Sequence, residues 1–240
     1  MSGRQKNLNR LANADLHVLN QHYIINYFLF KDIKWALQKF ATGKTLDLGC
    51  GNKPYRELFK FPVTEYIGCD IIQSSGNLVD VICPATELKF EDGVFDTVFS
   101  TQVIEHVDDH RKMLAETNRV LKLNGKAIFT IPFSWELHEE PYDFFRFSKY
   151  GIEYLFKKYG FEIVQIQSNG GKWAAIFQLF LNTLFSARKY GTLRSKFIKH
   201  FFITFRFIYF YNKFAVWLDK KYFDDILTLN YLVVAKKING

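Results

Sequence analysis

The sequence predicts an α/β fold: a seven-stranded, mostly parallel sheet with helices on both faces. Two observations predict it. Short, nearly continuous apolar runs alternate with helical patterns, and the first run ends in a glycine-rich turn. Strands that are buried on both faces of a parallel sheet have this nearly unbroken apolar character. The runs span residues 44–50, 66–71, 79–83, 95–100, 126–132, 161–168 and 230–237.

Helical patterns precede and separate these runs. Apolar side chains recur at three- and four-residue steps in the first segment, which predicts N-terminal helices. Asp108 or Asp109 can cap the second helix, and Asn124-Gly125 predicts its end. Ser148 can cap the third helix, which ends before a glycine. The three helical segments span residues 8–40, 108–123 and 148–159.

Composition argues against an exported or membrane-spanning protein. The 240 residues suffice for a core that needs neither a disulfide nor a metal ion. The three cysteines, Cys50, Cys69 and Cys83, are odd in number and match no zinc spacing. We therefore expect small buried thiols, no metal site and a reducing cytoplasm. The N-terminus lacks a signal-peptide pattern, and no run of 18 uncharged apolar residues occurs.

The segment from residue 169 to residue 229 is unusual in charge and composition. Residues 172–226 hold ten Lys/Arg and three Asp/Glu, a net of +7 out of +8 for the whole chain. They also hold 17 of the 43 aromatic residues. The sequence therefore predicts a nearly neutral body carrying a basic, aromatic-rich helical insertion before the last strand.

Cationic residues in this insertion recur every seven positions. Lys199, Arg206, Lys213 and Lys220 would form a nearly straight stripe on one helix, because seven residues turn a helix by about 700°. Three interpretations remain open: a lid over a large apolar acceptor site, a contact of residues 196–221 with an anionic membrane surface, or a packing or dimer element. Nucleic acid is a disfavoured partner, because no recognition module accompanies the phenylalanines. The oligomeric state stays open.

The glycine-rich turn after the first strand carries the chemical signal. It reads Asp47-Leu-Gly49-Cys-Gly51. A phosphate-binding P-loop would need a glycine where Gln38 stands, and a dinucleotide fingerprint would need one where Pro54 stands. An acidic residue, Asp70, is found at the end of the next strand. A carboxylate in that place can accept two hydrogen bonds from a ribose diol.

This motif resembles motif I of the class I S-adenosylmethionine-dependent methyltransferases, whose fold is Rossmann-like. Residues 95–100 resemble the family's fourth strand, the Glu105-His106 segment resembles the stretch after that strand, and residues 119–126 resemble its helix-to-strand turn. The resemblance is closest to the branch with quinone-biosynthesis and sugar methyltransferases. It implies one methyltransferase domain over residues 1–240, divided into N-terminal helices (1–43), a cofactor-binding core (44–168), the insertion (169–229) and the last strand (230–240).

The resemblance also implies which residues bind S-adenosylmethionine. The turn would hold its methionine end, the end of the second strand its ribose, and the end of the fourth strand would face the ligand crevice. Pro84 stands where the family often has an aspartate for adenine, so backbone groups near Ala85 are the substitute. The expected cofactor-binding residues are Asp47, Gly49, Cys50, Gly51, Asp70, Ile71, Ala85, Ser100 and Gln102.

Polar residues after the fifth strand are candidates for an acceptor site. Tyr142, Asp143 and Arg146 could line an acceptor pocket. His138 or His106 would be the general base, since histidine titrates near neutrality. Two structural alternatives stay open: Asp143 and Arg146 could simply pair on a helical turn, and either histidine could be a surface or capping residue.

The expected function is methyl transfer from S-adenosylmethionine to a small or lipid-linked acceptor, such as an envelope polysaccharide intermediate or a quinone precursor. The alternative is a non-catalytic protein: one that binds S-adenosylmethionine or S-adenosylhomocysteine, or a scaffold at a membrane surface. The expected location is cytoplasmic, or peripheral at the inner face of the membrane.

Overall fold

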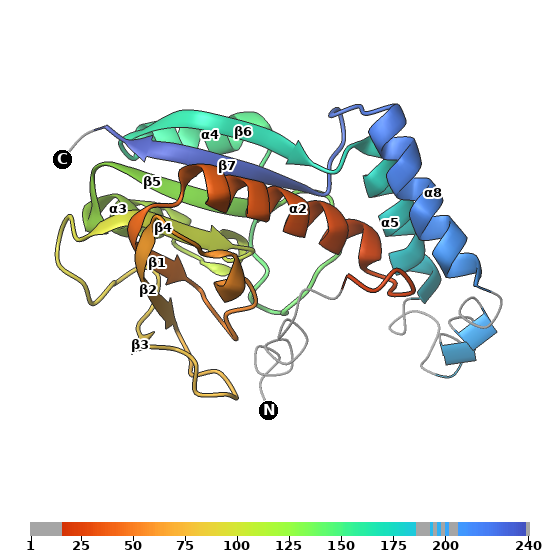
Figure 1. Ribbon diagram of the computed structural model, residues 1–240, viewed down its shortest axis with the longest axis horizontal. Helices are drawn as coiled ribbons and strands as arrows, with labels where there is room; N and C mark the ends of the chain where they lie inside the picture. Colours follow the sequence, from red (N-terminus) through yellow and green to blue (C-terminus); the bar gives the residue numbers. More distant parts are fainter. Residues whose placement is uncertain (1–15, 186–192, 194–195, 198–199, 202–205, 239–240) are drawn as a thin grey trace. The chain divides into compact units, whose positions relative to one another are not determined.

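The computed structural model describes residues 16–185, 193, 196–197, 200–201 and 206–238. Its centre is a seven-stranded sheet in the order β3-β2-β1-β4-β5-β7-β6, which confirms the predicted fold class (Figure 1). β1 to β5 pair in parallel, and β7 runs antiparallel to its neighbours. The strands are β1 (Gly43–Leu48), β2 (Val63–Asp70), β3 (Val81–Ile82), β4 (Phe95–Thr101), β5 (Leu121–Pro132), β6 (Phe161–Asn169) and β7 (Asn230–Lys237).

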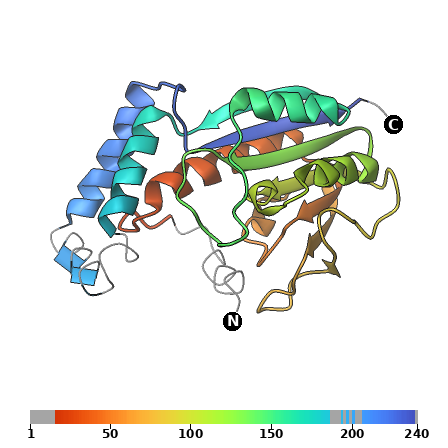
Figure 2. The ribbon, with the colours of Figure 1, turned by 180° about the vertical axis from the view of Figure 1, so that it is seen from behind.

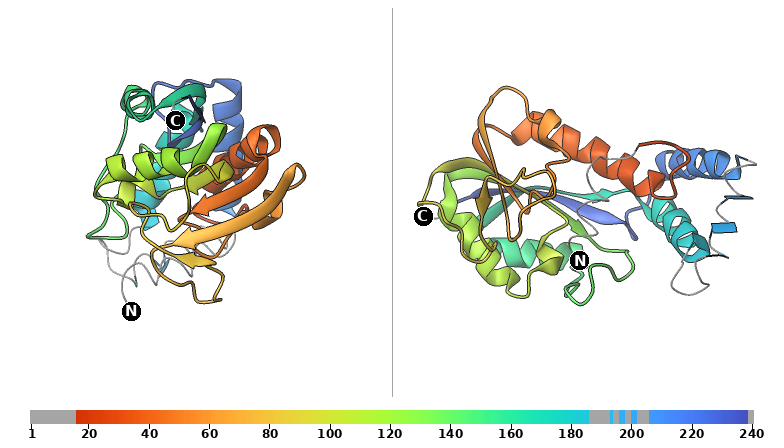
Figure 3. Two further views of the ribbon diagram at one scale, coloured as in Figure 1. Left: turned by 90° about the vertical axis from the view of Figure 1, so that its left-hand side faces the viewer. Right: turned by 90° about the horizontal axis from the view of Figure 1, so that it is seen from below.

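Helices cover both faces of this sheet. Helices α3 and α4 lie on one face, and residues 32–40 of α2 lie on the other (Figure 3). The predicted caps are confirmed: Asp109 accepts a hydrogen bond from the Lys112 N–H, and Ser148 accepts one from the Gly151 N–H. The helices are α2 (Tyr23–Phe40), α3 (His110–Val120), α4 (Lys149–Lys158), α5 (Lys172–Phe185) and α8 (Phe207–Lys221), with short 3₁₀ helices η1 (Arg56–Leu58) and η2 (Ile104–His106).

Strand β5 begins five residues earlier than the sequence predicts. The predicted helix end at 121–123 and the turn at Asn124-Gly125 lie inside the strand. The pairing with β4 passes from Phe95↔Leu121 to Thr97↔Lys126, so the intervening residues bulge out of the ladder. Asn124 takes up the bulge with a φ of 67°. The turn-forming dipeptide therefore makes a bulge within a strand instead of a link between a helix and a strand.

The chain divides into two compact units. The first, of residues 32–167 and 231–238, contains the sheet, α3 and α4. The second contains residues 16–31 and the described residues of the insertion between 168 and 230. Within this second unit, the Asn212 side-chain amide donates to the carbonyls of Val18 and Asn20 at 2.7 and 3.0 Å. The insertion thus builds its own buried polar contacts with the start of the chain.

Two helices of the second unit, α5 and α8, confirm that the insertion is helical, and they pack side by side (Figure 1). The predicted four-residue cationic stripe is wrong in part. Arg206 has a left-handed φ of 54° and α8 begins after it, so helical periodicity does not run through this residue. Lys199 lies outside the described residues, while Lys213 and Lys220 stand on α8. Within the described ranges, no helix is long and apolar enough to cross a membrane.

Candidate active site

The glycine turn after β1 packs against the segment after β4. Gly49 has a φ of 78°, and the N–H groups of Gly49 and Cys50 both donate to the Cys69 carbonyl, at 2.9 and 3.0 Å. A side chain on Gly49 would place its Cβ 2.4 Å from a methyl carbon of Val103. Position 49 therefore tolerates only glycine, both for its backbone angle and for its space. Cys50 itself is buried, as are the other two cysteines, and all three thiols are free.

Asp70 ends β2 beside this turn. One carboxylate oxygen accepts a hydrogen bond from the Gly51 N–H at 3.0 Å, and the other accepts one from Ile72 at 3.4 Å. These bonds hold the carboxylate at the carboxyl edge of the parallel sheet, where such sheets place their ligand crevice. Ile71 is 47% exposed next to it. Asp70 is therefore held at this edge, while its contact with a ribose and that of Ile71 with the cofactor stay predictions.

Asp47 points into the protein beneath the turn. Its side chain is buried, and one oxygen accepts a hydrogen bond from the Tyr66 hydroxyl. The other oxygen, Oδ1, has no hydrogen-bond partner within the described part of the chain. Burial raises the pKa of Asp47 to about 7, although Tyr66 and Lys53 oppose the rise. An unpartnered buried acceptor fits a cationic group, such as the ammonium of a bound methionine moiety.

A buried lysine supports the turn, and the sequence analysis missed it. The Lys53 ammonium lies 2.6 Å from a carboxylate oxygen of Asp80, which also accepts the Gly68 N–H at 2.6 Å. Lys53 has a positive φ of 54°. The available signal was a lysine directly after a glycine turn, with an aspartate directly before β3. Its positive charge lies near Asp47 and favours the charged form of that carboxyl group.

The other expected cofactor residues brace the sheet edge. The Ser100 hydroxyl is buried and donates to the Leu48 carbonyl at 2.9 Å. The Gln102 amide donates to the Thr130 hydroxyl at 3.2 Å. Ala85 is half-buried in the turn after β3. These contacts hold the carboxyl ends of β1, β4 and β5 together, while direct contact with a cofactor stays a prediction for all three residues.

A long loop, residues 133–148, connects β5 to α4 and is pinned to η2 (Figure 2). The Phe144 N–H donates to the Glu105 carbonyl at 2.9 Å. The Nδ1 atom of His106 lies 2.8 Å from the carbonyl oxygen of Tyr142. Because a carbonyl only accepts, Nδ1 carries the hydrogen and Nε2 keeps its lone pair. His106 can therefore act as a base or as a ligand through Nε2.

Asp143 and Arg146 form an ion pair within this loop. The two guanidinium nitrogens lie 2.5 and 2.8 Å from the two carboxylate oxygens, and the Asp143 side chain is buried. Asp143 also accepts the backbone N–H of His138 at 3.0 Å. Burial alone would raise the pKa of Asp143, but Arg146 and the His138 N–H hold it below its usual value. The pairing alternative is confirmed, but on an extended loop instead of a helical turn.

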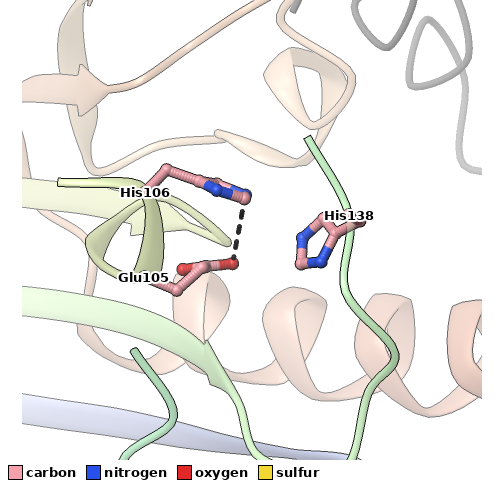
Figure 4. A group of neighbouring side chains, drawn as sticks. All are labelled: Glu105, His106 and His138. Atoms are coloured by element: carbon pink, nitrogen blue, oxygen red, sulfur yellow. Dashed lines mark ion pairs between the residues drawn. The ribbon is translucent and has the colours of Figure 1, made fainter. Parts of the chain in front are cut away.

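Three titratable side chains meet between η2 and the loop: Glu105, His106 and His138 (Figure 4). The two imidazole rings pack edge to face with centroids 4.7 Å apart. Burial, together with His106, lowers the pKa of His138 to about 4, so this ring is neutral at pH 7. Burial raises the pKa of Glu105 to about 8. Tyr142, by contrast, contributes its carbonyl here, and its side chain is 45% exposed.

Glu105 is the residue that sequence reasoning passed over. The sequence indicates it only as part of the Glu-His segment, whereas the structure places it at the centre of the polar cluster, with no exposed surface. The available signal was a carboxylate beside His106, inside a short segment whose other residues, Val103, Ile104 and Val107, are apolar. A charged residue in such a segment must find partners or stay neutral once it is buried.

The sequence and fold comparisons agree on the cofactor-binding core. Residues 46–129 match the family model described as a methyltransferase domain. An uncharacterized protein of Methanocaldococcus jannaschii is 34% identical over 109 residues, which cover 43% of this chain and 48% of that protein. The chain therefore spans about half the length of this curated relative.

Solved structures share the fold at low sequence identity. A [4+2]-cyclase, SpnF, has a TM-score of 0.54 and 17% identity, covering 87% of this chain and 81% of that one. Phosphoethanolamine N-methyltransferase 2 of Haemonchus contortus, solved with S-adenosylmethionine, has a TM-score of 0.51 and 21% identity, covering 87% and 53%. At these identities the solved structures show the fold alone: with the sheet order they identify a Rossmann-like α/β fold, in which residues 46–129 match a methyltransferase domain.

Proposed function

We propose that this chain transfers a methyl group from S-adenosylmethionine to a small-molecule acceptor. The observation that carries the proposal is the set of acceptors around the glycine turn: the fixed carboxylate of Asp70 and the unpartnered Oδ1 of Asp47. S-adenosylmethionine, when bound, supplies a methyl group activated by its positively charged sulfur. The task of the chain's own residues is then mostly positioning, as in other displacement reactions between bound partners.

His106 is the group best placed to take a proton from an acceptor. Its Nδ1 hydrogen is committed to the Tyr142 carbonyl, which leaves Nε2 as the proton-accepting atom. η2, which carries His106, comes after β4 at the edge of the sheet that holds the glycine turn. His138 packs against the His106 ring, and its pKa of about 4 makes it a weak proton acceptor at pH 7. Asp143 and Arg146 position the loop that carries His138.

Binding of S-adenosylhomocysteine tests this proposal directly. At a hundredfold excess over its dissociation constant it should stabilise the wild type by about 2.7 kcal/mol, a rise of roughly 5–10 °C in melting temperature. Asp70→Asn keeps an acceptor for the Gly51 N–H but places an amide hydrogen toward the ribose diol, so most of the rise should disappear. Glu91→Gln, at an exposed loop position, is the matched control. A wild type that shows no rise would contradict the proposal.

The second unit favours an amphiphilic or lipid-linked acceptor. A groove of about 880 Å³ opens among aromatic side chains of this unit, including Phe210, Phe214 and Trp217. Each of these three side chains is about half exposed or more, and Lys213 and Lys220 stand on the same helix. Exposed aromatic residues beside lysines are typical of segments that rest on an anionic lipid surface. An envelope polysaccharide intermediate on a lipid carrier and a quinone precursor both fit this chemistry.

Vesicle binding tests this part of the proposal. The double variant Phe210→Ser/Trp217→Ser should sediment with phosphatidylglycerol vesicles at least tenfold more weakly than the wild type, because it loses the apolar contact. Tyr150→Ser on α4, where the tyrosine is 76% exposed, is the matched control and should bind like the wild type. Equal binding by all three proteins, or no binding by the wild type, would exclude the membrane role.

A non-catalytic role is the second candidate. Its support is Pro84, which stands where the family often has an aspartate for adenine, because the fold alone does not determine whether a chain catalyses a reaction. Transfer of a labelled methyl group into a chloroform-extractable product separates the two candidates. A catalyst transfers the label and loses this activity in His106→Ala, whereas a scaffold only binds S-adenosylhomocysteine or vesicles.

A further inference from the structure

The polar cluster between η2 and the loop has the composition of a metal site. Glu105, His106 and His138 each offer one ligand atom, and these three atoms lie within 4.8 Å of one another (Figure 4). We propose that they bind a divalent transition-metal ion of the Zn²⁺, Fe²⁺ or Mn²⁺ class. The prediction of no metal site rested on the cysteines, and none of the three side chains is a cysteine.

The buried carboxylate is the strongest argument. Glu105 has no exposed surface, and neither of its oxygens has a hydrogen-bond partner within the described part of the chain. Its closest cationic candidate is His106, whose Nε2 lies 3.8 Å from Oε1, beyond hydrogen-bond distance. A buried carboxylate without hydrogen bonds is unfavourable unless a cation pairs with it. A metal ion between Glu105 and the imidazoles would pair with this carboxylate through one of its oxygens.

The hydrogen bonds of the two histidines point their ligand atoms inward. His106 donates Nδ1–H to the Tyr142 carbonyl, so Nε2 is left as a ligand. Nδ1 of His138 lies 3.3 Å from both the Glu136 carbonyl and a carboxylate oxygen of Asp143, which can accept its hydrogen. It also lies 3.5 Å from the Arg146 guanidinium, which can only donate, so the donor role of Nδ1 depends on the two acceptors. Metal-binding histidines typically donate their other ring N–H to a carbonyl or a carboxylate in this way.

The dimensions require little movement. Ligand atoms on a tetrahedral zinc ion are about 3.3 Å apart, given bonds of about 2.0–2.1 Å. The Glu105–His106 pair is at 3.8 Å and all three ligand atoms lie within 4.8 Å of one another, so side-chain rotations that bring them closer by up to about 1.5 Å would form the site. A second carboxylate oxygen, from Glu139, lies 4.0 Å from the same His106 nitrogen. The positive charge of Arg146 lies near Glu105 and would repel a metal ion there. This charge is offset by Asp143, with which the Arg146 guanidinium is paired.

Three protein ligands leave at least one position of the ion open. Catalytic metal sites share this feature, and the open position takes water or an oxygen of a substrate. Two imidazoles and one carboxylate suit zinc, iron and manganese better than magnesium or calcium, which prefer oxygen ligands. The proposal concerns metal binding alone and does not depend on methyl transfer.

Metal binding is tested on the full chain after chelation and dialysis. Addition of Zn²⁺ should raise the melting temperature, because the ion binds the folded chain. Co²⁺ should give visible absorption bands when it occupies the same site. The dissociation constants of both ions should be below about 10 μM. Glu105→Gln and His138→Asn should each weaken binding at least tenfold. Glu105→Gln is isosteric, His138→Asn is smaller than the ring it replaces, and circular dichroism checks that both variants fold.

The matched control is His110→Asn. His110 is the first residue of α3 and packs against Phe145 and Phe147 of the loop. It is not part of the cluster, so this variant should bind both ions like the wild type. If the wild-type protein bound neither Zn²⁺ nor Co²⁺ at an ion concentration of 100 μM, the proposal would be overturned. Unchanged binding in folded Glu105→Gln and His138→Asn would overturn it too, because the ion would then be held elsewhere. Binding of S-adenosylhomocysteine, measured on the same samples, is a separate readout.

Discussion

Replacing Asp47 by asparagine should raise the melting temperature at pH 8 by about 5–15 °C in the absence of ligand. Burial raises the pKa of Asp47 from 3.8 to about 7, so the folded protein resists the charge that the unfolded chain carries. Stability contributed by such a group is complete below pH 3.8 and is lost as the pH rises toward 7. The loss is about 1.4 kcal/mol per pH unit, or about 4 kcal/mol over the whole range.

The pH dependence is the distinguishing measurement for this variant. The gap in stability between Asp47→Asn and the wild type should be small at pH 4 and should grow up to about pH 7. Although the variant gains stability, its affinity for S-adenosylhomocysteine should fall at least tenfold, because an amide cannot pair with an ammonium as a carboxylate can. An asparagine variant that is less stable than the wild type at pH 8 would show that Lys53 already compensates the Asp47 charge.

Asp80 provides a control of opposite sign. Burial would raise the pKa of its carboxyl group, but the Gly68 N–H and Lys53 hold the pKa below the usual value. Its contribution to stability is therefore present at neutral pH and is lost on acidification. Asp80→Asn should lower the melting temperature at pH 8, since it also leaves the buried Lys53 ammonium unpaired. Two aspartates near one turn thus respond to the same substitution in opposite directions.

Local signals predicted most of the fold correctly. The caps at Asp109 and Ser148 and the strand ends at Leu48 and Asp70 depend on neighbouring residues alone, and the structure confirms them to within two residues. The early start of β5 could not be predicted in this way. It depends on pairing with β4, a contact between residues about 26 positions apart in the chain. Tertiary pairing here overrides the turn preference of Asn124-Gly125.

The candidate site was predictable by residue but not by contact. The sequence grouped His138, Asp143 and Arg146 after the fifth strand and gave His106 as an alternative base. In the structure His106 packs against His138, whose N–H donates to Asp143, which pairs with Arg146. The sequence could not show which atoms are engaged. The Nδ1 hydrogen bond of His106 goes to the backbone of Tyr142, and a backbone acceptor leaves no trace in residue identity. The sequence could not single out Glu105 either, because its burial without a hydrogen-bond partner is visible only in the structure.

Gly49→Ala should destabilise the protein by about 2–5 kcal/mol and abolish S-adenosylhomocysteine binding. A left-handed backbone costs alanine about 1–2 kcal/mol, and an added methyl in a packed site costs about 1–3 kcal/mol more. The second cost applies at position 49, because the new Cβ would lie 2.4 Å from a Val103 methyl carbon. For a chain of this size the expected fall in melting temperature is about 5–15 °C.

A second glycine separates backbone strain from crowding. Gly93 has a φ of 63°, and a Cβ added there would meet nothing closer than the Leu121 carbonyl oxygen at 4.0 Å. Gly93→Ala should therefore show the strain alone, about 1–2 kcal/mol, and should bind S-adenosylhomocysteine normally. A loss as large as that of Gly49→Ala would mean that the backbone angle alone, and not Val103, makes position 49 intolerant.

Removing the Val103 methyl groups completes the argument. In the double variant Gly49→Ala/Val103→Ala the overlapping carbons are gone, and the closest remaining contact is the Val103 Cβ at 3.2 Å. The loss in the double variant should therefore be smaller than the sum of the two single losses, with a coupling energy of about 1–3 kcal/mol. Additive losses would mean that the turn after β1 and the segment after β4 do not pack as the structure shows. A measured coupling would place the cofactor turn and the segment leading to Glu105 and His106 in direct contact.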